Sequence, residues 1–293
     1  MTEAGKVRSG FRSLVSVAWL QAAPIAAIMA FFLVIPIVVI VVVSFWDYTE
    51  YDIIPSFVFT NYTDVFGSWV TYETYFSTLR FAVLTWFFTL LIGFWIAYFL
   101  VFHVRSKTWQ TTLFLICTLP FLTSNVIRSI AWIPVLGRNG LVNSALIGLG
   151  VINTPLEFLL FSDFSVVLSY VHLFVLFMVV PIFNTMMRID RSLIEAAVDA
   201  GASGWQVVRD IIIPLSKPGI AIGSIFVVTL VMGEFITVRL MSGGQSASVG
   251  LMISNQLNYL QYPAAAANAV VLLGVVLLIV AAMMRVVDIR KEL

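Results

Sequence analysis

Long apolar runs separated by short polar segments set the pattern of this chain. A helix needs about 20 mainly apolar residues to cross the hydrocarbon core of a bilayer. Several runs reach that length, and none repeats another at a fixed period. The pattern therefore predicts an all-α, polytopic membrane protein with a single membrane domain at 19–285. We expect six spanning helices, at about 19–45, 76–102, 111–135, 164–187, 217–239 and 264–285.

A polar segment at 188–217 interrupts this pattern between the fourth and fifth runs. Ser192 stands three residues before Glu195, and Ser203 stands three residues before Gln206. This spacing is typical of a capping box, in which each side chain bonds a free backbone N–H at the start of a helix. The segment therefore predicts two short helices in succession.

Glycine and proline mark the expected ends of these two helices. Gly201 lies where the first must end, because a left-handed residue after a helix is least strained as glycine. Pro214 is expected to stop the second, since proline lacks the N–H that a helix interior needs. Trp205, Val208 and Ile212 recur at helical spacing and predict one apolar face. By these signals alone, the segment is also typical of an amphipathic hairpin on the membrane surface.

Composition supports a membrane protein and excludes several classes of site. Hydrophobic residues make up 61% of the chain and charged residues 11%, whereas about a quarter of a soluble domain is charged. The single cysteine and two distant histidines give no disulfide framework and no metal-ligand spacing. We expect no bound nucleic acid, because the basic residues are not clustered. We also expect no ATP on this chain, since it lacks a phosphate-binding P-loop.

Basic residues predict the orientation in the membrane. The segment 46–75 has no Lys or Arg and carries five acidic residues. Cytoplasmic segments are enriched in Lys and Arg, so we expect this segment outside and both termini inside, with 1–18 and 286–293 as cytoplasmic ends. Twelve of the 16 basic residues then face the cytoplasm, together with the polar segment. They are Lys6, Arg8, Arg12, Arg105, Lys107, Arg188, Arg191, Arg209, Lys217, Arg285, Arg290 and Lys291.

Ionisable residues inside predicted spans are candidate functional sites, because charge at that depth is costly. Glu234 lies in the fifth span, where a carboxylate needs a wet cavity, a cationic ligand or a basic partner. Arg239 is the nearest basic residue in sequence, but a spacing of five residues does not bring two helical side chains together. A packed structural role for Glu234 is the alternative.

Arg128 ends a polar stretch in the middle of the third span. Pro120 and Pro134 flank that stretch, a combination that favours a kinked helix lining an aqueous path. Asn125 either faces this path or bonds a neighbouring helix. Trp132 and Tyr170 are aromatic candidates along the same path, since aromatic faces attract cations.

The polar segment resembles the EAA loop of ABC importer permeases. The residues that carry the resemblance are Glu195-Ala196-Ala197, Gly201, Ile213-Pro214 and Pro218. The resemblance implies a type I ABC importer permease fold, with this loop docking in a cleft of an ATP-hydrolysing subunit. The coupling residues that it implies are Glu195, Ala196, Ala197, Gly201, Ser203, Trp205 and Pro214. Glu195 has the simpler alternative role of a capping residue.

Three further segments are similar to permeases of the spermidine/putrescine importer family. They are 128–143, the run 233–237 followed by Gly243-Gly244, and 262–266. The family commonly has Asp where Glu234 stands and Pro where Val238 stands, so the charge is kept while the local shape differs.

This resemblance implies a bacterial inner-membrane subunit that performs no covalent chemistry and moves its solute by alternating access. The implied partners are an ATPase dimer that binds ATP and Mg²⁺, a second permease subunit in a heterodimer, a periplasmic solute-binding protein and membrane lipid. Polyamine is the favoured solute, and an opine, an amino-acid derivative, thiamine or ferric iron are alternatives. A secondary transporter or a membrane enzyme fits less well, for want of an inverted repeat or a catalytic residue set. The residues that we expect along the solute pathway are the polar and aromatic candidates within the spans: Glu234, Phe235, Arg128, Trp132, Tyr170 and Asn125.

The predicted orientation has a direct test. In a Cys117→Ala background, Ser56→Cys should react with an impermeant thiol reagent on intact spheroplasts, and Ser203→Cys should react only after the membrane is opened. The reason is that basic residues place 188–217 inside and leave 46–75 outside. Labelling of position 203 from outside would overturn the orientation.

Overall fold

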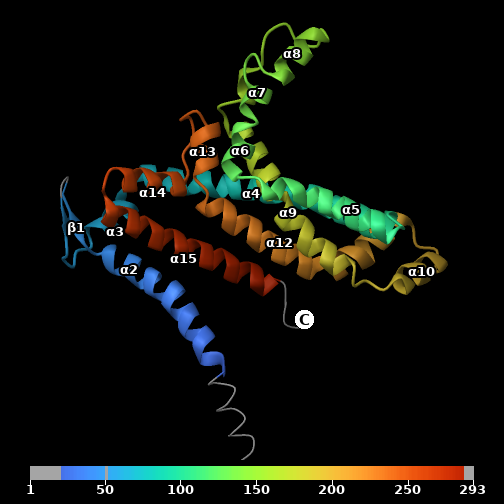
Figure 1. Ribbon diagram of the computed structural model, residues 1–293, viewed down its shortest axis with the longest axis horizontal. Coiled ribbons are helices and arrows are strands. Elements are labelled where there is room, and N and C mark those ends of the chain that lie inside the picture. The colour runs from blue at the N-terminus through green and yellow to red at the C-terminus, as the bar shows by residue number, and fades with distance from the viewer. Residues whose placement is uncertain (1–20, 50–51, 287–293) are drawn as a thin grey trace, which may run out of the picture.

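Helices dominate the computed structural model, which describes residues 21–49 and 52–286 (Figure 1). This confirms the all-α prediction; the one sheet in the described residues is a short hairpin of β1 (Asp47–Tyr48) and β2 (Ile53–Ile54). The start of the first predicted span and the expected cytoplasmic segment 1–18 lie outside the described residues. So does most of the tail at 286–293.

Five continuous helices are long and apolar enough to cross a membrane. Three of the predicted spans, the second, fourth and sixth, correspond to such helices over nearly their whole length. The five helices are Gln21–Val43, Trp69–His103, Glu157–Met186, Gly204–Gly233 and Tyr262–Arg285. Their main segments are α2 (Ile35–Val43), α4 (Trp69–Tyr98), α9 (Asp163–Met186), α12 (Ile213–Gly233) and α15 (Tyr262–Val286). Single π-helical turns, η1 (Ala30–Val34), η2 (Phe99–His103) and η5 (Val208–Ile212), extend α2, α4 and α12.

The third predicted span is a bent pair of helical segments, Lys107–Leu122 and Asn125–Gly148, which makes a sixth span if the pair is counted as one. The kink expected in this stretch is confirmed, but the break is sharper than a kink within one helix. The first half of the span is α5 (Lys107–Thr118), which tightens into a 3₁₀ turn at η3 (Leu119–Leu122). Thr123 and Ser124 then adopt extended backbone angles, and the chain turns by 93°. Pro120 in the 3₁₀ turn explains the break, because its ring removes a helical N–H and clashes with the preceding turn.

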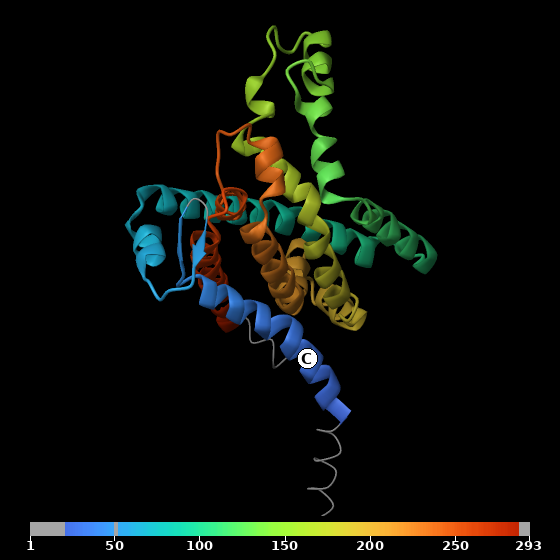
Figure 2. The ribbon, with the colours of Figure 1, turned by 60° about the vertical axis from the view of Figure 1, so that its left-hand side comes forward.

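Beyond this bend the chain forms an arm that projects away from the packed helices. The arm contains α6 (Asn125–Ile130), α7 (Ile133–Leu136) and α8 (Leu141–Gly148), and it stands apart in both ribbon views (Figures 1 and 2). Asn143 is fully buried and fixes the segment in which the chain returns from the tip of the arm. Its Nδ2 donates to the carbonyls of Gly137 and Leu156, and its Oδ1 accepts from the Leu156 N–H.

The fifth predicted span also ends early. Helix α12 stops at Gly233, Glu234 is extended with ψ 135°, and a separate short helix, α13 (Ile236–Met241), follows. The expectation of a helix through residue 239 was therefore wrong. Helix α14 (Val249–Asn258) lies between α13 and α15, and α3 (Thr60–Gly67) lies beside the hairpin (Figure 1).

Helix α9 is the centre of the packed bundle, where it contacts both α4 and α12, which also contact each other. Gly219 and Gly223 of α12 form a small-xxx-small pair that allows close approach to α9. A Cβ at Gly219 would lie 2.5 Å from the Pro181 carbonyl oxygen, so the contact is backbone against backbone. Met178 of α9 fills the space next to Gly223 and is fully buried.

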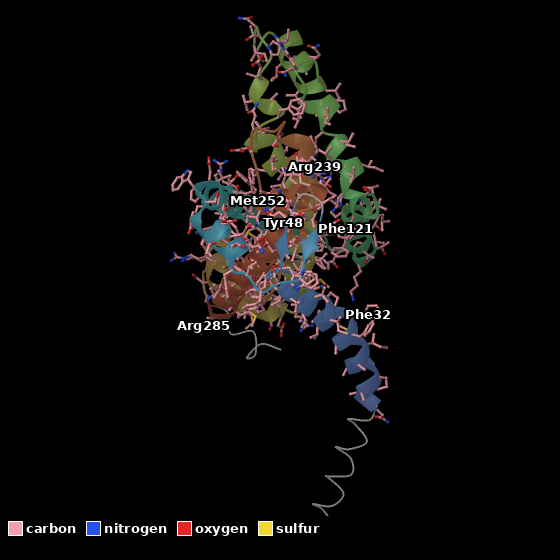
Figure 3. All side chains as sticks on the ribbon, turned by 90° about the vertical axis from the view of Figure 1, so that its left-hand side faces the viewer. Phe32, Tyr48, Phe121, Arg239, Met252 and Arg285 are labelled. Atoms are coloured by element: carbon pink, nitrogen blue, oxygen red, sulfur yellow. The ribbon has the colours of Figure 1, made fainter. Side chains whose placement is uncertain are left out.

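Helix α2, by contrast, has no buried residue, and Phe32 in the preceding turn is 72% exposed (Figure 3). Apolar exposure of this kind suits a helix whose solvent is lipid.

The close approach of α9 and α12 predicts an effect of size at position 219. Gly219→Val should lower the stability of the purified protein in detergent by about 1–3 kcal/mol, because overpacking forces the helices apart. Gly274→Val is the matched control, since no atom lies within 4 Å of a Cβ built there. The measurement is the thermal unfolding midpoint, and equal midpoints for the two variants would contradict the packing argument.

Candidate functional site

The first helix of the polar segment is α10 (Arg191–Asp199), and its cap differs from the prediction. Asp190 is the N-cap residue, and its carboxylate accepts the Ser192 backbone N–H at 3.0 Å. This bond holds the pKa of Asp190 below its usual value. The predicted capping box of Ser192 with Glu195 was therefore wrong, because an aspartate two residues earlier already satisfies the helix start. The exposed carboxylate of Glu195 pairs with no described residue.

The end of α10 confirms the role predicted for Gly201. Its φ is +87°, the left-handed region that favours glycine. The Gly201 N–H bonds the Val198 carbonyl at 2.9 Å, and the Ala202 N–H bonds the Ala197 carbonyl at 2.9 Å. This pair of bonds is a Schellman motif, which closes the helix and reverses the chain.

The second helix begins as predicted but does not end as predicted. It starts at α11 (Gly204–Val207), where the Gln206 N–H bonds the Ser203 hydroxyl and the Ser203 N–H bonds Gln206 Oε1 at 2.7 Å. The helix then passes through η5 and Pro214 into α12. The expectation that Pro214 stops it was wrong. A wide π-helical turn precedes the proline, which stands in the first turn of α12 where its missing N–H is tolerated.

The predicted apolar face of this second helix is only partly buried. Val208 and Ile212 are 5% and 2% exposed, while Trp205 is 62% exposed. Leu193 and Val198 of α10 are also exposed, at 49% and 55%. The hairpin of α10 and α11 thus presents apolar side chains that the described chain does not cover.

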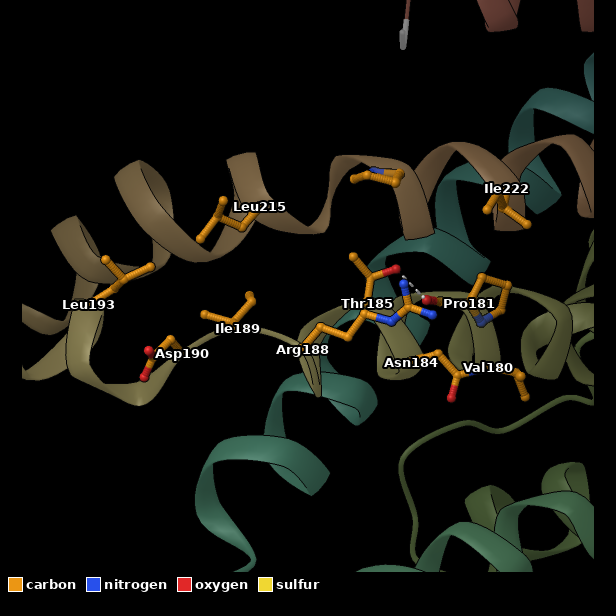
Figure 4. A pocket seen from close by; sticks show the side chains of 11 residues that line it. Val180, Pro181, Asn184, Thr185, Arg188, Ile189, Asp190, Leu193, Leu215 and Ile222 are labelled. Atoms are coloured by element: carbon orange, nitrogen blue, oxygen red, sulfur yellow. Dashed lines mark hydrogen bonds between the residues drawn. The ribbon is translucent and has the colours of Figure 1, made fainter. Parts of the chain in front are cut away.

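A cavity of about 520 Å³ lies behind this hairpin, between the end of α9 and the first turns of α12 (Figure 4). Pro181, Asn184 and Arg188 border it from α9 and the turn after it, and Leu215 borders it from α12. The Thr185 hydroxyl donates a hydrogen bond of 2.9 Å to the Pro181 carbonyl beside the cavity. On either side of the cavity, the hairpin is joined to α9 by a short loop and to α12 by continuous helix.

A second group of candidate residues meets at the break between α12 and α13. Glu234 was predicted to lie inside the fifth spanning helix. It lies instead in the break after α12, and its side chain caps α13. Its Oε1 accepts the N–H groups of Ile236 and Thr237 at 3.0 and 3.1 Å, and its Oε2 accepts that of Thr237 at 3.0 Å. A carboxylate at this position satisfies donors that the break leaves free and suits the positive end of the helix dipole.

Three other elements converge on the same break. The Tyr170 hydroxyl of α9 donates to the Glu234 carbonyl at 3.4 Å, and Ser248 before α14 donates to it at 3.3 Å. Ser129 of α6 bonds the Thr237 hydroxyl of α13 at 3.3 Å. The predictions missed Ser129, Thr237 and Ser248, because serine and threonine in apolar runs carry no distinctive spacing.

The remaining predicted residues flank this junction in the arm. Arg128 is 7% exposed, donates to Asn125 Oδ1 at 2.6 Å and lies over the Phe121 ring. Trp132 Nε1 donates to Nδ1 of His172 at 3.1 Å, which joins the arm to α9.

Phe235 follows Glu234 in the break and lies under the Arg239 guanidinium, 5.7 Å from ring centre to Cζ. Arg239, which is labelled in Figure 3, also donates to Ser254 and Asn255 of α14. Arg239 therefore does not pair with Glu234, in agreement with the spacing argument.

A family profile described as "Binding-protein-dependent transport system inner membrane component" matches residues 91–292. The spermidine/putrescine transport system permease protein PotB of Escherichia coli K12 is 31% identical over 270 residues, covering 90% of this chain and 97% of the relative. PotB of Salmonella typhimurium LT2 is 34% identical over 212 residues, covering 71% and 73%.

Solved structures show the same fold at low sequence identity. One chain of a bacterial alginate ABC transporter, in complex with an alginate pentasaccharide-bound periplasmic protein, matches with a TM-score of 0.76 and 21% identity over 97% of each chain. A chain of the MetNI methionine ABC transporter matches 77% of this chain with a TM-score of 0.53.

The cap at Glu234 predicts which substitution releases α13. Glu234→Ala should speed amide exchange across 235–241, because it removes the side-chain acceptor of the first N–H groups of α13, and loss of such an acceptor at a helix start costs about 0.5–2 kcal/mol. Glu234→Gln keeps one acceptor and should fall between Ala and wild type. Glu195→Ala, which removes an exposed carboxylate without a described partner, is the control. Hydrogen exchange with mass spectrometry measures the effect; unchanged protection in Glu234→Ala would refute the capping role.

Proposed function

The chain belongs to the family of binding-protein-dependent transport system inner membrane components, and we propose that it carries polyamines such as spermidine and putrescine through that membrane by ATP-driven alternating access. It is a multi-pass inner-membrane permease component of an ABC importer, a non-enzymatic subunit. The observation that carries the choice of solute is the near full-length similarity to PotB, 31% identity over 90% of this chain.

The coupling step is assigned to the hairpin of α10 and α11. Its exposed apolar side chains, Leu193, Val198 and Trp205, and the unpaired Glu195 form a surface suited to a cleft in an ATPase subunit. Ala196, Ala197, Gly201 and Ser203 set the shape of that surface through the helix ends described above. ATP and Mg²⁺ then belong to the ATPase dimer.

Transmission from that surface follows from the continuity of the second helix. The helix Gly204–Gly233 has 30 residues, which at 1.5 Å per residue spans about 45 Å. Pro214 lies within it and does not divide it. A displacement of the hairpin is therefore carried to the break at Glu234, where α9, α6 and α14 meet. Two arrangements of this junction, each favoured by different partners, constitute alternating access.

The solute pathway is assigned to the side chains around the break. Glu234 supplies negative charge, and Phe235, Trp132 and Tyr170 supply aromatic faces, a combination that attracts amines. Asn125 and Arg128 border the same junction from the arm. One carboxylate cannot balance a polyvalent amine, so a different second permease subunit supplies the remaining acidic groups. A periplasmic binding protein delivers the solute to the outer loops, and both termini lie in the cytoplasm.

Uptake by the assembled transporter tests this function. Proteoliposomes holding both permease subunits and the ATPase should accumulate labelled putrescine and spermidine only with internal ATP and external binding protein. Uptake without ATP would point to a secondary transporter. Uptake of an opine, thiamine or ferric iron, without uptake of polyamines, would overturn the choice of solute but would leave the assignment to an ATP-driven importer unchanged.

A variant in the hairpin tests the coupling assignment in the same system. Gly201→Val places a β-branched residue at φ +87°, which costs more than about 1 kcal/mol locally. It should abolish uptake and weaken co-purification of the ATPase while leaving membrane levels near wild type. Gly204→Ala, at a glycine with open space around its Cβ position and no positive φ, is the matched control. Normal uptake in Gly201→Val would contradict the assignment of the coupling step to this hairpin.

A further inference from the structure

A cavity of about 350 Å³ lies where η2 ends and where α5 and α10 begin. Three basic side chains line it, those of Arg105, Lys107 and Arg191, and no lining residue is Asp or Glu. The cavity lies at the end of the bundle that carries α10 (Figure 1). None of the three basic residues belongs to the coupling set or to the solute pathway assigned above, so the cavity is separate from both.

The positive charge in this cavity is not compensated within the described chain. Arg105 and Lys107 are exposed, and neither forms an ion pair or a hydrogen bond with any described residue. Arg191 donates from Nη2 to the Val101 carbonyl at 3.1 Å, which holds its guanidinium beside η2 but gives its charge no carboxylate partner. Helix α5 begins at Lys107 without a side-chain cap, so its positive end adds to the charge. The cavity therefore favours an anion with several acceptor oxygens.

An apolar groove of about 400 Å³ follows the same two elements, α4–η2 and α5, farther from this end of the bundle. Its lining residues are Trp95, Ile96, Phe99, Leu100, Leu113 and Cys117. Trp95 and Phe99 are 45% and 53% exposed, and both belong to a helix long and apolar enough to cross a membrane. Apolar exposure at this depth suits a surface whose solvent is lipid.

One face of α5 runs from the cavity into the groove. Lys107 and Gln110 line the cavity, and Leu113 and Cys117 line the groove. Residues three and four apart lie on the same side of a helix, so these four form a single stripe. Lys107 and Cys117 are ten residues apart, which at 1.5 Å per residue is about 15 Å, or half of the roughly 30 Å hydrocarbon core. Charge at the membrane surface and an apolar wall through one leaflet are thus aligned.

We propose that the cavity and the groove together bind one anionic phospholipid, with its phosphate among Arg105, Lys107 and Arg191 and an acyl chain against Phe99 and Leu113. Arginine and lysine form strong, charge-assisted hydrogen bonds to phosphate oxygens. Basic pockets between spanning helices are typical binding sites for phosphate-bearing lipid headgroups. A free phosphate ion would satisfy the charges but would leave the groove unused, so a lipid fits both features.

Occupancy of this site has a structural consequence for the α10–α11 hairpin. Arg191 is the first residue of α10, whereas Arg105 and Lys107 lie between η2 and the start of α5. A phosphate held by all three would tie the start of the hairpin to the ends of α4 and α5. The assignment rests on this local chemistry and not on the solute proposed above, so its test measures lipid binding and not transport.

Photocrosslinking locates the lipid on the assembled transporter in nanodiscs of phosphatidylcholine. The probe is a trace of phosphatidylglycerol that carries a diazirine on one acyl chain, and mass spectrometry maps its adducts on this chain. Adducts within 95–117 should be about tenfold more abundant than with a phosphatidylcholine probe of the same chains, because only the first has a net negative charge. Adducts on Gln21–Val43, a candidate span with no buried residue in its most apolar part, serve as the internal reference. Unlabelled phosphatidylglycerol should remove the excess, whereas its headgroup alone, glycerophosphoglycerol, should not.

Matched variants decide whether the basic cavity causes this preference. Arg105→Gln with Lys107→Gln should remove the excess of adducts, and the fold should persist because neither side chain bonds a described residue. Arg209→Gln with Lys217→Gln removes the same charge outside the cavity and should keep the excess. An unchanged thermal unfolding midpoint confirms that the first variant is folded.

Four outcomes would each overturn the proposal. They are equal labelling by the two probes, an excess that survives Arg105→Gln with Lys107→Gln, and displacement of the lipid by glycerophosphoglycerol, which would indicate a site for free phosphate. The fourth is an excess that appears only when the ATPase is left out, which would assign the cavity to a contact between subunits.

Discussion

Every backbone N–H and C=O that lies in hydrocarbon must find a partner within the protein, and this constraint organises the whole molecule. It is the reason for the long continuous helices, and it also explains how the two interruptions are built. Where α12 ends, the Glu234 carboxylate takes up the free N–H groups of α13, while Tyr170 and Ser248 bond the Glu234 carbonyl. Where α5 ends, a 3₁₀ turn closes the helix before the chain bends.

The same constraint gives the α10–α11 hairpin a rigid connection to the interior. A proline in mid-helix would normally break the hydrogen-bond ladder, but a π-helical turn before Pro214 accommodates it and keeps the helix Gly204–Gly233 whole. Gly219 and Gly223 then seat this helix against α9 at backbone distance. Because packing inside a membrane depends on close contact and not on exclusion of water, this glycine pair favours the association of α9 with α12.

The two ends of the bundle differ in chemistry. One end carries an exposed apolar hairpin, rimmed by basic residues such as Arg188 and Arg191, and suited to a protein partner. The other carries the segment 46–75, which has five acidic residues and no Lys or Arg.

The sequence by itself determined the features that depend on neighbours a few residues apart. These include the long apolar helices, the Ser203–Gln206 capping box and the left-handed Gly201, because each is stabilised within one or two helical turns. The motif residues around Glu195 were enough to indicate the family. Only the tertiary structure decided the rest. Asp190 displaced Ser192 as the cap because both residues, two positions apart, carry the same local signal. The junction at Glu234 depends on side chains from helices far apart in sequence, whose meeting no local pattern encodes.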